Sequence, residues 1–238
     1  MSLFTIEQAL QPQGGQVSQL FMIFTDAHER HDKQAGYQEV IQAIAKTFPS
    51  AAIVLASPGE KLTHYESLVE HHSLSDEQIK SFVQQHQQDL QGLIKTFQSH
   101  LQIDSAATAV IGIGQIGSLV LELTKLAEPL AGRVITFGSR YAELPTEKLS
   151  LDQTIHLLHA GQDKLIPFAH AVSAQQTIAA LEGDATIDVA HQIEHSFSTL
   201  LIEQMMQRLL SCVPLRYWKE AQESALSPDP ASKQDSIH

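Results

Sequence analysis

The chain has 238 residues, of which 43% are hydrophobic, and it carries a formal net charge of -12 at pH 7. This length fits one α/β domain with a sizeable core better than two ordinary domains. The negative balance opposes a phosphate backbone, which is normally bound by clustered Lys and Arg, so we expect no nucleic-acid partner.

Nothing in the sequence marks the chain for a membrane or for export. Its longest apolar runs, such as Gln19 to Phe24, are too short to cross a bilayer as a helix. The start, Met1 to Gln13, lacks a basic region followed by an apolar stretch of signal-peptide length. Cys212 is the only cysteine and can form no internal disulfide. The sequence therefore predicts a cytoplasmic protein without a membrane span.

Strand-like and helix-like segments alternate along the chain. Apolar, β-branched runs bounded by turn residues predict strands, and segments with helical spacing lie between them. Near-continuous apolar strands separated by helices predict a mostly parallel sheet covered on both faces, a doubly wound α/β fold. In chain order the expected strands are Phe4–Leu10 (at an edge), Gln19–Phe24, Ala51–Leu55, Thr108–Ile113, Arg133–Phe137, Thr154–His159 and Ala185–Val189, and the expected helices are Gly36–Thr47, Asp76–Leu101, Ile116–Leu126, Pro167–Leu181 and Phe197–Leu210.

The end of the chain differs in composition from the rest. Residues 1–223 are predicted to form one domain, and the polar segment 224–238 has too little apolar content to pack, which predicts a disordered tail. Tyr217 and Trp218 are expected to anchor a last short helix on the body of the domain.

A histidine-rich loop follows the first core strand. It contains Asp26, His28, His31 and Asp32, which could ligate a metal. Scattered, solvated histidines explain the same pattern, and two firm ligand pairs are missing. We therefore expect neither a metal nor an organic cofactor.

Gly112, Gly114 and Gly117 follow a buried strand and open a helix, which allows two interpretations. They spell the dinucleotide fingerprint G-x-G-x-x-G, and Arg140 after the next strand could face a 2′-phosphate. The fingerprint, however, belongs to the first βα turn of its domain, whereas some hundred residues precede this motif. A nucleophile elbow, G-x-S-x-G, also occupies a tight strand-to-helix turn but in the middle of its sheet. The order of elements favours the elbow.

Further motifs follow this turn in a fixed order. They are Arg133-Val134-Ile135, Ser139-Arg140-Tyr141-Ala142-Glu143-Leu144-Pro145, Thr154-Ile155-His156-Leu157-Leu158-His159-Ala160-Gly161-Gln162-Asp163, Ala169-His170-Ala171-Val172, Ile187-Asp188-Val189 and Glu194-His195. In order and spacing they resemble the phospholipase/carboxylesterase family of α/β-hydrolases, in particular its small bacterial carboxylesterases and acyl-protein thioesterase-like members. The resemblance extends over roughly Gln19 to Glu220 and implies an α/β-hydrolase fold.

The resemblance also implies a catalytic triad that is incomplete in this chain. The family order Ser, Asp, His places Asp163 and His195 at the second and third positions. The family's elbow G-F-S-Q-G aligns with Gly112-Ile113-Gly114-Gln115-Ile116, so Gly114 stands at the nucleophile position and offers no side chain. The nearest hydroxyl, on Ser118, is about one helical turn away and is a poor substitute.

The implied oxyanion hole departs from the family pattern as well. Its two donors would be the backbone N–H groups of Gln115 and Ala27. The family has a His-Gly start to the loop after the first core strand, where this chain has Thr25-Asp26. We expect the negative charges of Asp26 and Glu29 to oppose a forming oxyanion.

Three functions are compatible with these features. The first is a noncatalytic or redirected homologue that binds a small acyl-type molecule or a protein partner. The second is a residual carboxylic ester hydrolase in which Asp163 and His195 activate water. The third is a nucleotide-binding protein that uses the Gly112-Gly114-Gly117 turn. A homodimer is the most common assembly for such a protein.

Overall fold

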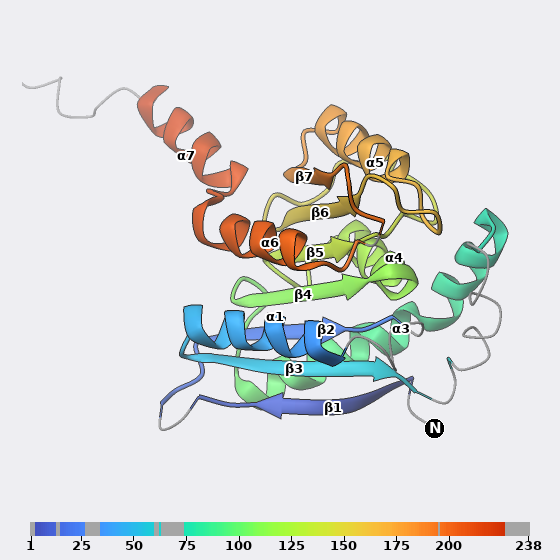
Figure 1. Cartoon of the computed structure of the whole chain (residues 1–238). Helices are drawn as coiled ribbons and strands as arrows, with labels where there is room; N and C mark the ends of the chain where they lie inside the picture. Colours follow the sequence, from blue (N-terminus) through green and yellow to red (C-terminus); the bar gives the residue numbers. More distant parts are fainter. Residues whose placement is uncertain are drawn as a thin grey trace, which may run out of the picture.

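A computed structural model of the chain describes residues 3–12, 15–26, 34–59, 62, 74–194 and 196–226. Seven strands form one sheet in the spatial order β1-β3-β2-β4-β5-β6-β7 (Figure 1). The strands are β1 (Phe4–Leu10), β2 (Gln19–Phe24), β3 (Ala51–Pro58), β4 (Thr108–Ile113), β5 (Arg133–Phe137), β6 (Thr154–Ala160) and β7 (Ala185–Ala190). The helices are α1 (Gln34–Thr47), α3 (Asp76–Leu101), α4 (Gly114–Glu122), the short 3₁₀ turn η3 (Leu123–Lys125), α5 (Ala169–Ala180), α6 (Thr199–Ser211) and α7 (Leu215–Leu226).

The sheet is parallel except at one edge. β2 to β7 pair in parallel, whereas β1 pairs antiparallel with β3 and carries a register shift between Ile6 and Gln8. The chain runs outward from β2 to β3 and then returns to β4 on the other side of β2. The direction of winding therefore reverses between β2 and β4, and the crevice at the carboxyl ends of such strands is where open α/β sheets bind ligands.

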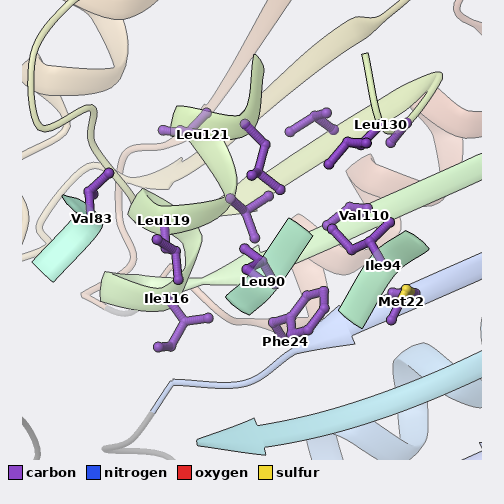
Figure 2. Packing of buried hydrophobic residues seen from close by; sticks show 14 of the residues in the cluster. Met22, Phe24, Val83, Leu90, Ile94, Val110, Ile116, Leu119, Leu121 and Leu130 are labelled. Carbon is purple, nitrogen blue, oxygen red and sulfur yellow. The ribbon is translucent and has the colours of Figure 1, made fainter. Parts of the chain in front are cut away.

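Helices cover both faces of the sheet, as expected for parallel strands. Within β2, Met22 and Phe24 face one side and belong to the core cluster that includes α3, α4 and α5 residues. Figure 2 shows Leu90 and Ile94 of α3 lying over this side of the sheet, close to Val110. The alternate β2 residues Phe21 and Ile23 face the other side, where they pack with residues of α1 and α6. This double burial explains why the strands read as unbroken apolar runs.

The predicted α/β-hydrolase fold and its elements are confirmed with small shifts at their ends. Helix α3 begins where predicted because Ser75 and Gln78 form a reciprocal capping box at its start. Helix α4 begins at Gly114, two residues earlier than predicted. Helix α6 begins at Thr199, because Phe197 packs in the core against the rings of Tyr37 and Phe137 before the helix starts.

The C-terminal helix differs from expectation. α7 runs to Leu226, so three residues of the predicted tail, 224–226, are helical, and residues 227–238 lie outside the described part of the chain. The prediction that Tyr217 and Trp218 anchor this helix is wrong, because these residues are 50% and 61% exposed. None of the described helices is long and apolar enough to cross a membrane.

Candidate functional site

Three glycines shape the turn from β4 into α4. Gly114 has a φ of +56°, a left-handed conformation that glycine adopts without steric cost. A Cβ on Gly112 would lie 2.6 Å from the Cα of Gly117, and a Cβ on Gly117 would overlap the Ser139 hydroxyl. Close packing of strand, helix and the next loop therefore accounts for Gly112 and Gly117 without any bound phosphate.

Asp26, two residues beyond the end of β2, reaches the start of α4. Its Oδ2 accepts a hydrogen bond from the backbone N–H of Gln115 at 3.0 Å, and the residue is 8% exposed. A carboxylate is stabilised at this position because the amino-terminal end of a helix carries partial positive charge and unpaired N–H groups. The N–H of Gln115 was predicted to be an oxyanion donor, and in this structure it donates to Asp26.

The same carboxylate fills the space next to Gly114. A Cβ built on Gly114 would lie 2.6 Å from Asp26 Cγ and closer still to Oδ2, well inside van der Waals contact. Glycine at position 114 is thus required both by the backbone conformation and by its neighbour.

Asp163 lies in the loop after β6, where the family resemblance placed the acidic residue of the triad. Its Oδ1 accepts the backbone N–H groups of Leu165 and Ile166 at 2.9 and 3.0 Å. Its Oδ2 accepts a hydrogen bond from the Ser196 hydroxyl at 2.8 Å. The Ser196 oxygen in turn accepts the N–H of Ala160 at 3.0 Å. These bonds join the end of β6 to the loop that follows β7.

His195 and Ala27 lie outside the described residues, so the predicted pairing of His195 with Asp163 and the donor role of Ala27 stay predictions. Ser196, the described residue that follows His195, contacts Asp163 directly. Sequence reasoning missed Ser196, although its position beside the expected histidine was a usable signal.

Gly138, after β5, was also missed. Its φ is +57°, and a Cβ there would lie 2.6 Å from the Ser196 side chain and 3.1 Å from Asp163 Oδ2. This glycine therefore allows the loop after β7 to approach the end of β5.

These residues surround a cavity of about 120 Å³ at the carboxyl ends of the strands. Glu194 and Lys164 are exposed on its lining, whereas Asp26, Gln115 and Ser196 are buried. The rings of Phe137 and Phe197 meet edge to face, with their centroids 5.4 Å apart. Among the described residues, the lining consists of Asp26, Ile113, Gly114, Gln115, Phe137, Gly138, Asp163, Lys164, Leu165, Ile166, Glu194, Ser196 and Phe197.

His159 and Ser118 lie outside the cavity lining and hold nearby loops in place. His159 is buried and donates from Nε2 to the carbonyl oxygen of Ile166 at 2.6 Å, and burial lowers its pKa below the ordinary value. The neutral ring thereby fixes the loop that carries Asp163. The Ser118 hydroxyl is fully buried and accepts the N–H of Arg140 at 3.2 Å, so it does not face the cavity as a substitute nucleophile.

Among the described residues, no three His, Cys, Asp or Glu side chains are grouped as metal ligands. Of the loop considered for metal binding, His28, His31 and Asp32 lie outside the described residues.

Solved structures share this architecture at low sequence identity. Esterase PE8 superposes with a TM-score of 0.68 at 14% identity, covering 87% of this chain and 98% of its own. A phospholipase/carboxylesterase from Dyadobacter fermentans DSM 18053 superposes with a TM-score of 0.65 at 13% identity, covering 89% of this chain and 97% of its own. At such identities the likeness concerns the fold alone.

Sequence comparison identifies the family. Esterase YpfH of Escherichia coli (strain K12) is 38% identical over 128 residues, which are 54% of this chain and 55% of the relative. The match thus spans about half the length of this curated relative. The sequence model of the family described as Phospholipase/Carboxylesterase matches residues 59–213. By this match over more than half of its length, the chain belongs to the phospholipase/carboxylesterase family of α/β-hydrolases.

Proposed function

We propose that this family member does not carry out serine-dependent ester hydrolysis and that its cavity binds a small molecule instead. One observation carries the proposal. The Asp26 carboxylate occupies the space beside Gly114 and accepts the N–H of Gln115 at 3.0 Å. Gly114, at the position that the family resemblance assigns to the nucleophile, has no hydroxyl, and the space that a side chain there would take is filled by the carboxylate of Asp26, which follows β2.

The chemistry of acyl transfer makes this arrangement unfavourable. A serine hydrolase needs a nucleophilic hydroxyl and preorganised donors for the oxyanion of its tetrahedral intermediate. Here the Gln115 donor is already bonded to Asp26. A forming oxyanion at this N–H would also lie close to the carboxylate that accepts from it, and like charges repel.

Among the described lining residues, Ser196 carries a hydroxyl group, and it does not replace the nucleophile. Ser196 lines the cavity, but its hydroxyl donates to Asp163 and accepts the N–H of Ala160. Its oxygen would have to give up both partners before it could attack a carbonyl carbon. The apolar wall formed by Phe137 and Phe197 still provides a surface for a ligand.

Ester hydrolysis tests the proposal. We expect the wild-type chain to hydrolyse p-nitrophenyl acetate no faster than a His195→Ala control and to show no covalent labelling by serine-directed phosphonates. The esterase YpfH, which is named for that activity, is a suitable positive control. Stoichiometric phosphonate labelling of the wild-type chain would refute the proposal.

A second candidate is residual hydrolysis by activated water. Its support is that Asp163 lines the cavity and is bonded to Ser196, the residue after the predicted triad histidine. Ester hydrolysis that is lost in His195→Ala and is insensitive to phosphonates would favour this candidate over the noncatalytic one.

A further inference from the structure

A second cavity lies at the opposite end of the sheet from the candidate site. Its volume is about 230 Å³, and its lining includes the first residues of three parallel strands, Gln19 of β2, Thr108 of β4 and Arg133 of β5. These are the strand ends without arrowheads in Figure 1. Among the described residues, the lining consists of Gln19, Phe21, Phe48, Ala106, Ala107, Thr108, Ala109, Arg133, Leu209, Pro214, Arg216 and Tyr217.

Arg133 brings a partly buried guanidinium group to this cavity. The group donates to the carbonyl oxygens of Gly132 and Cys212, both at 3.3 Å, and to the Thr154 hydroxyl at 3.0 Å. All three acceptors are neutral, so these bonds position the guanidinium but do not balance its charge. Burial lowers the pKa of Arg133 below its ordinary value, and the nearby positive charge of Arg216 acts in the same direction.

Arg216, in the first turn of α7, supplies the second positive charge. Its guanidinium donates to the Leu151 carbonyl oxygen at 3.5 Å and to the Tyr217 hydroxyl at 3.3 Å, which are again neutral acceptors. Within the part of the chain that the structure describes, neither Arg133 nor Arg216 forms a salt bridge with a carboxylate. Two cations therefore line one cavity without an ion-pair partner among these residues.

The described lining contains no acidic side chain, and each lining residue has described neighbours on both sides in the chain. Asp184 attracts Arg133 without forming a salt bridge, and its Oδ2 accepts the Thr154 hydroxyl at 2.7 Å and the Leu215 N–H at 2.9 Å. The cavity is thus locally positive in a chain whose formal net charge is -12. Such a cavity attracts an anion.

Part of the wall is apolar. The rings of Phe21 and Phe48 lie with their centroids 5.1 Å apart, and Leu209 and Pro214 add aliphatic surface. An inorganic anion gains nothing from these walls, whereas an anion with an aromatic ring buries apolar surface against them. Because a cavity of about 150 Å³ can hold benzene, the volume of about 230 Å³ is sufficient for a ring that carries a carboxylate.

We propose that this cavity binds a small aromatic carboxylate, whose oxygens accept hydrogen bonds from Arg133 and Arg216 and whose ring packs against Phe21 and Phe48. The planar fork of a guanidinium matches the two oxygens of a carboxylate, and charge-assisted bonds of this kind are stronger than bonds between neutral groups. The site is independent of the function proposed for the cavity at the carboxyl ends of the strands, because the two cavities share no lining residue among those described.

Calorimetric titration of the wild-type chain tests the proposal without any substitution. Sodium benzoate, benzyl alcohol and benzylammonium chloride have similar shapes and differ in charge, and the ionic strength is matched with sodium chloride. We expect benzoate to bind about tenfold or more tightly than the alcohol, and benzylammonium to bind more weakly than either. Equal affinity for benzoate and the alcohol, tighter binding of benzylammonium, or displacement of benzoate by chloride at equal concentration would each overturn the proposal.

An Arg216→Gln variant locates the binding site. Glutamine keeps a hydrogen-bond donor at this position but removes the charge. We expect the affinity for benzoate to fall by about tenfold or more, whereas Lys95→Gln, which removes an exposed positive charge outside the cavity lining, leaves the affinity unchanged. Both variants are expected to keep the urea midpoint of the wild-type chain, so that the loss of affinity reflects the site and not the fold. Unchanged affinity in Arg216→Gln, or an equal fall in both variants, would contradict the assignment.

Discussion

Replacing Gly114 by serine brings a side chain into the space that the Asp26 carboxylate holds. A Cβ at position 114 would lie 2.6 Å from Asp26 Cγ, so the carboxylate has to leave the N–H of Gln115. Losing a hydrogen bond to a charged group costs about 1.5 to 3 kcal/mol, and a left-handed φ costs a residue with a Cβ about 1 to 2 kcal/mol. We expect Gly114→Ser to lower the free energy of unfolding by about 2.5 to 5 kcal/mol.

A double-mutant cycle with Asp26→Gly separates two contributions to the destabilisation. One is the clash between the new side chain at position 114 and Asp26, and the other is the left-handed backbone conformation at position 114. Once Asp26 is removed, Gly114→Ser should cost only the backbone contribution, about 1 to 2 kcal/mol. The double variant should therefore lose less free energy of unfolding than the sum of the losses in the two single variants. In urea unfolding we expect a difference of about 1.5 to 3 kcal/mol. Gly92→Ser is the matched control, because nothing lies within 4 Å of a Cβ there. Additivity within about 0.5 kcal/mol would refute the proposed contact.

Three further predictions follow from single contacts. NAD and NADP should show no saturable binding at micromolar concentrations, because packing explains Gly112 and Gly117; saturable binding abolished by a bulky residue at Gly114 would contradict this. Ser196→Ala should lower unfolding free energy by about 1 to 3 kcal/mol, since Asp163 and Ala160 both lose a partner, whereas exposed Ser211→Ala should change it by about 0.5 kcal/mol or less. Burial, with a smaller contribution from Arg133, lowers the pKa of His156 from 6.5 to about 3. The unfolded chain therefore takes up a proton that the folded chain does not, and the free energy of unfolding decreases as pH falls below 6.5. Between pH 7 and pH 5 this decrease, measured by urea unfolding, should be about 2 kcal/mol smaller in His156→Leu than in wild type.

Much of the fold is encoded in local patterns. The bounds of β2, β4, β5 and α3 match their predictions, because unbroken apolar runs and helical spacing are determined by neighbouring residues. The observed start of α4 is earlier than the predicted one. Glycine in a sequence usually indicates a loop, but here Gly114 is the first residue of the helix. The exposure of Trp218 could not be predicted, since it depends on where α7 lies relative to the body.

The candidate site was only partly accessible to sequence reasoning. The family resemblance located Gly114 and Asp163, and both line the cavity. The contact between Asp26 and Gln115 joins residues 89 positions apart, and that between Ser196 and Asp163 joins residues 33 apart. The local spacing of apolar and polar residues cannot predict contacts between residues so far apart in the chain. It arises because parallel strands bring their carboxyl ends to one edge of the sheet.

Restoring ester hydrolysis then depends on two changes that act on different atoms. Gly114→Ser supplies a hydroxyl, but while Asp26 is present the N–H of Gln115 has a competing acceptor. One oxyanion donor contributes about 2.7 to 4 kcal/mol to transition-state stabilisation, or roughly 100-fold to 1,000-fold in rate. We therefore expect the Gly114→Ser and Asp26→Gly double variant to hydrolyse p-nitrophenyl acetate on the order of 100-fold faster than Gly114→Ser alone. Adding Thr25→His, which completes the His-Gly start of the family's loop, should increase the rate further. Strong activity from Gly114→Ser alone would mean that Asp26 leaves the donor free during the reaction and that only the nucleophile separates this chain from an active esterase.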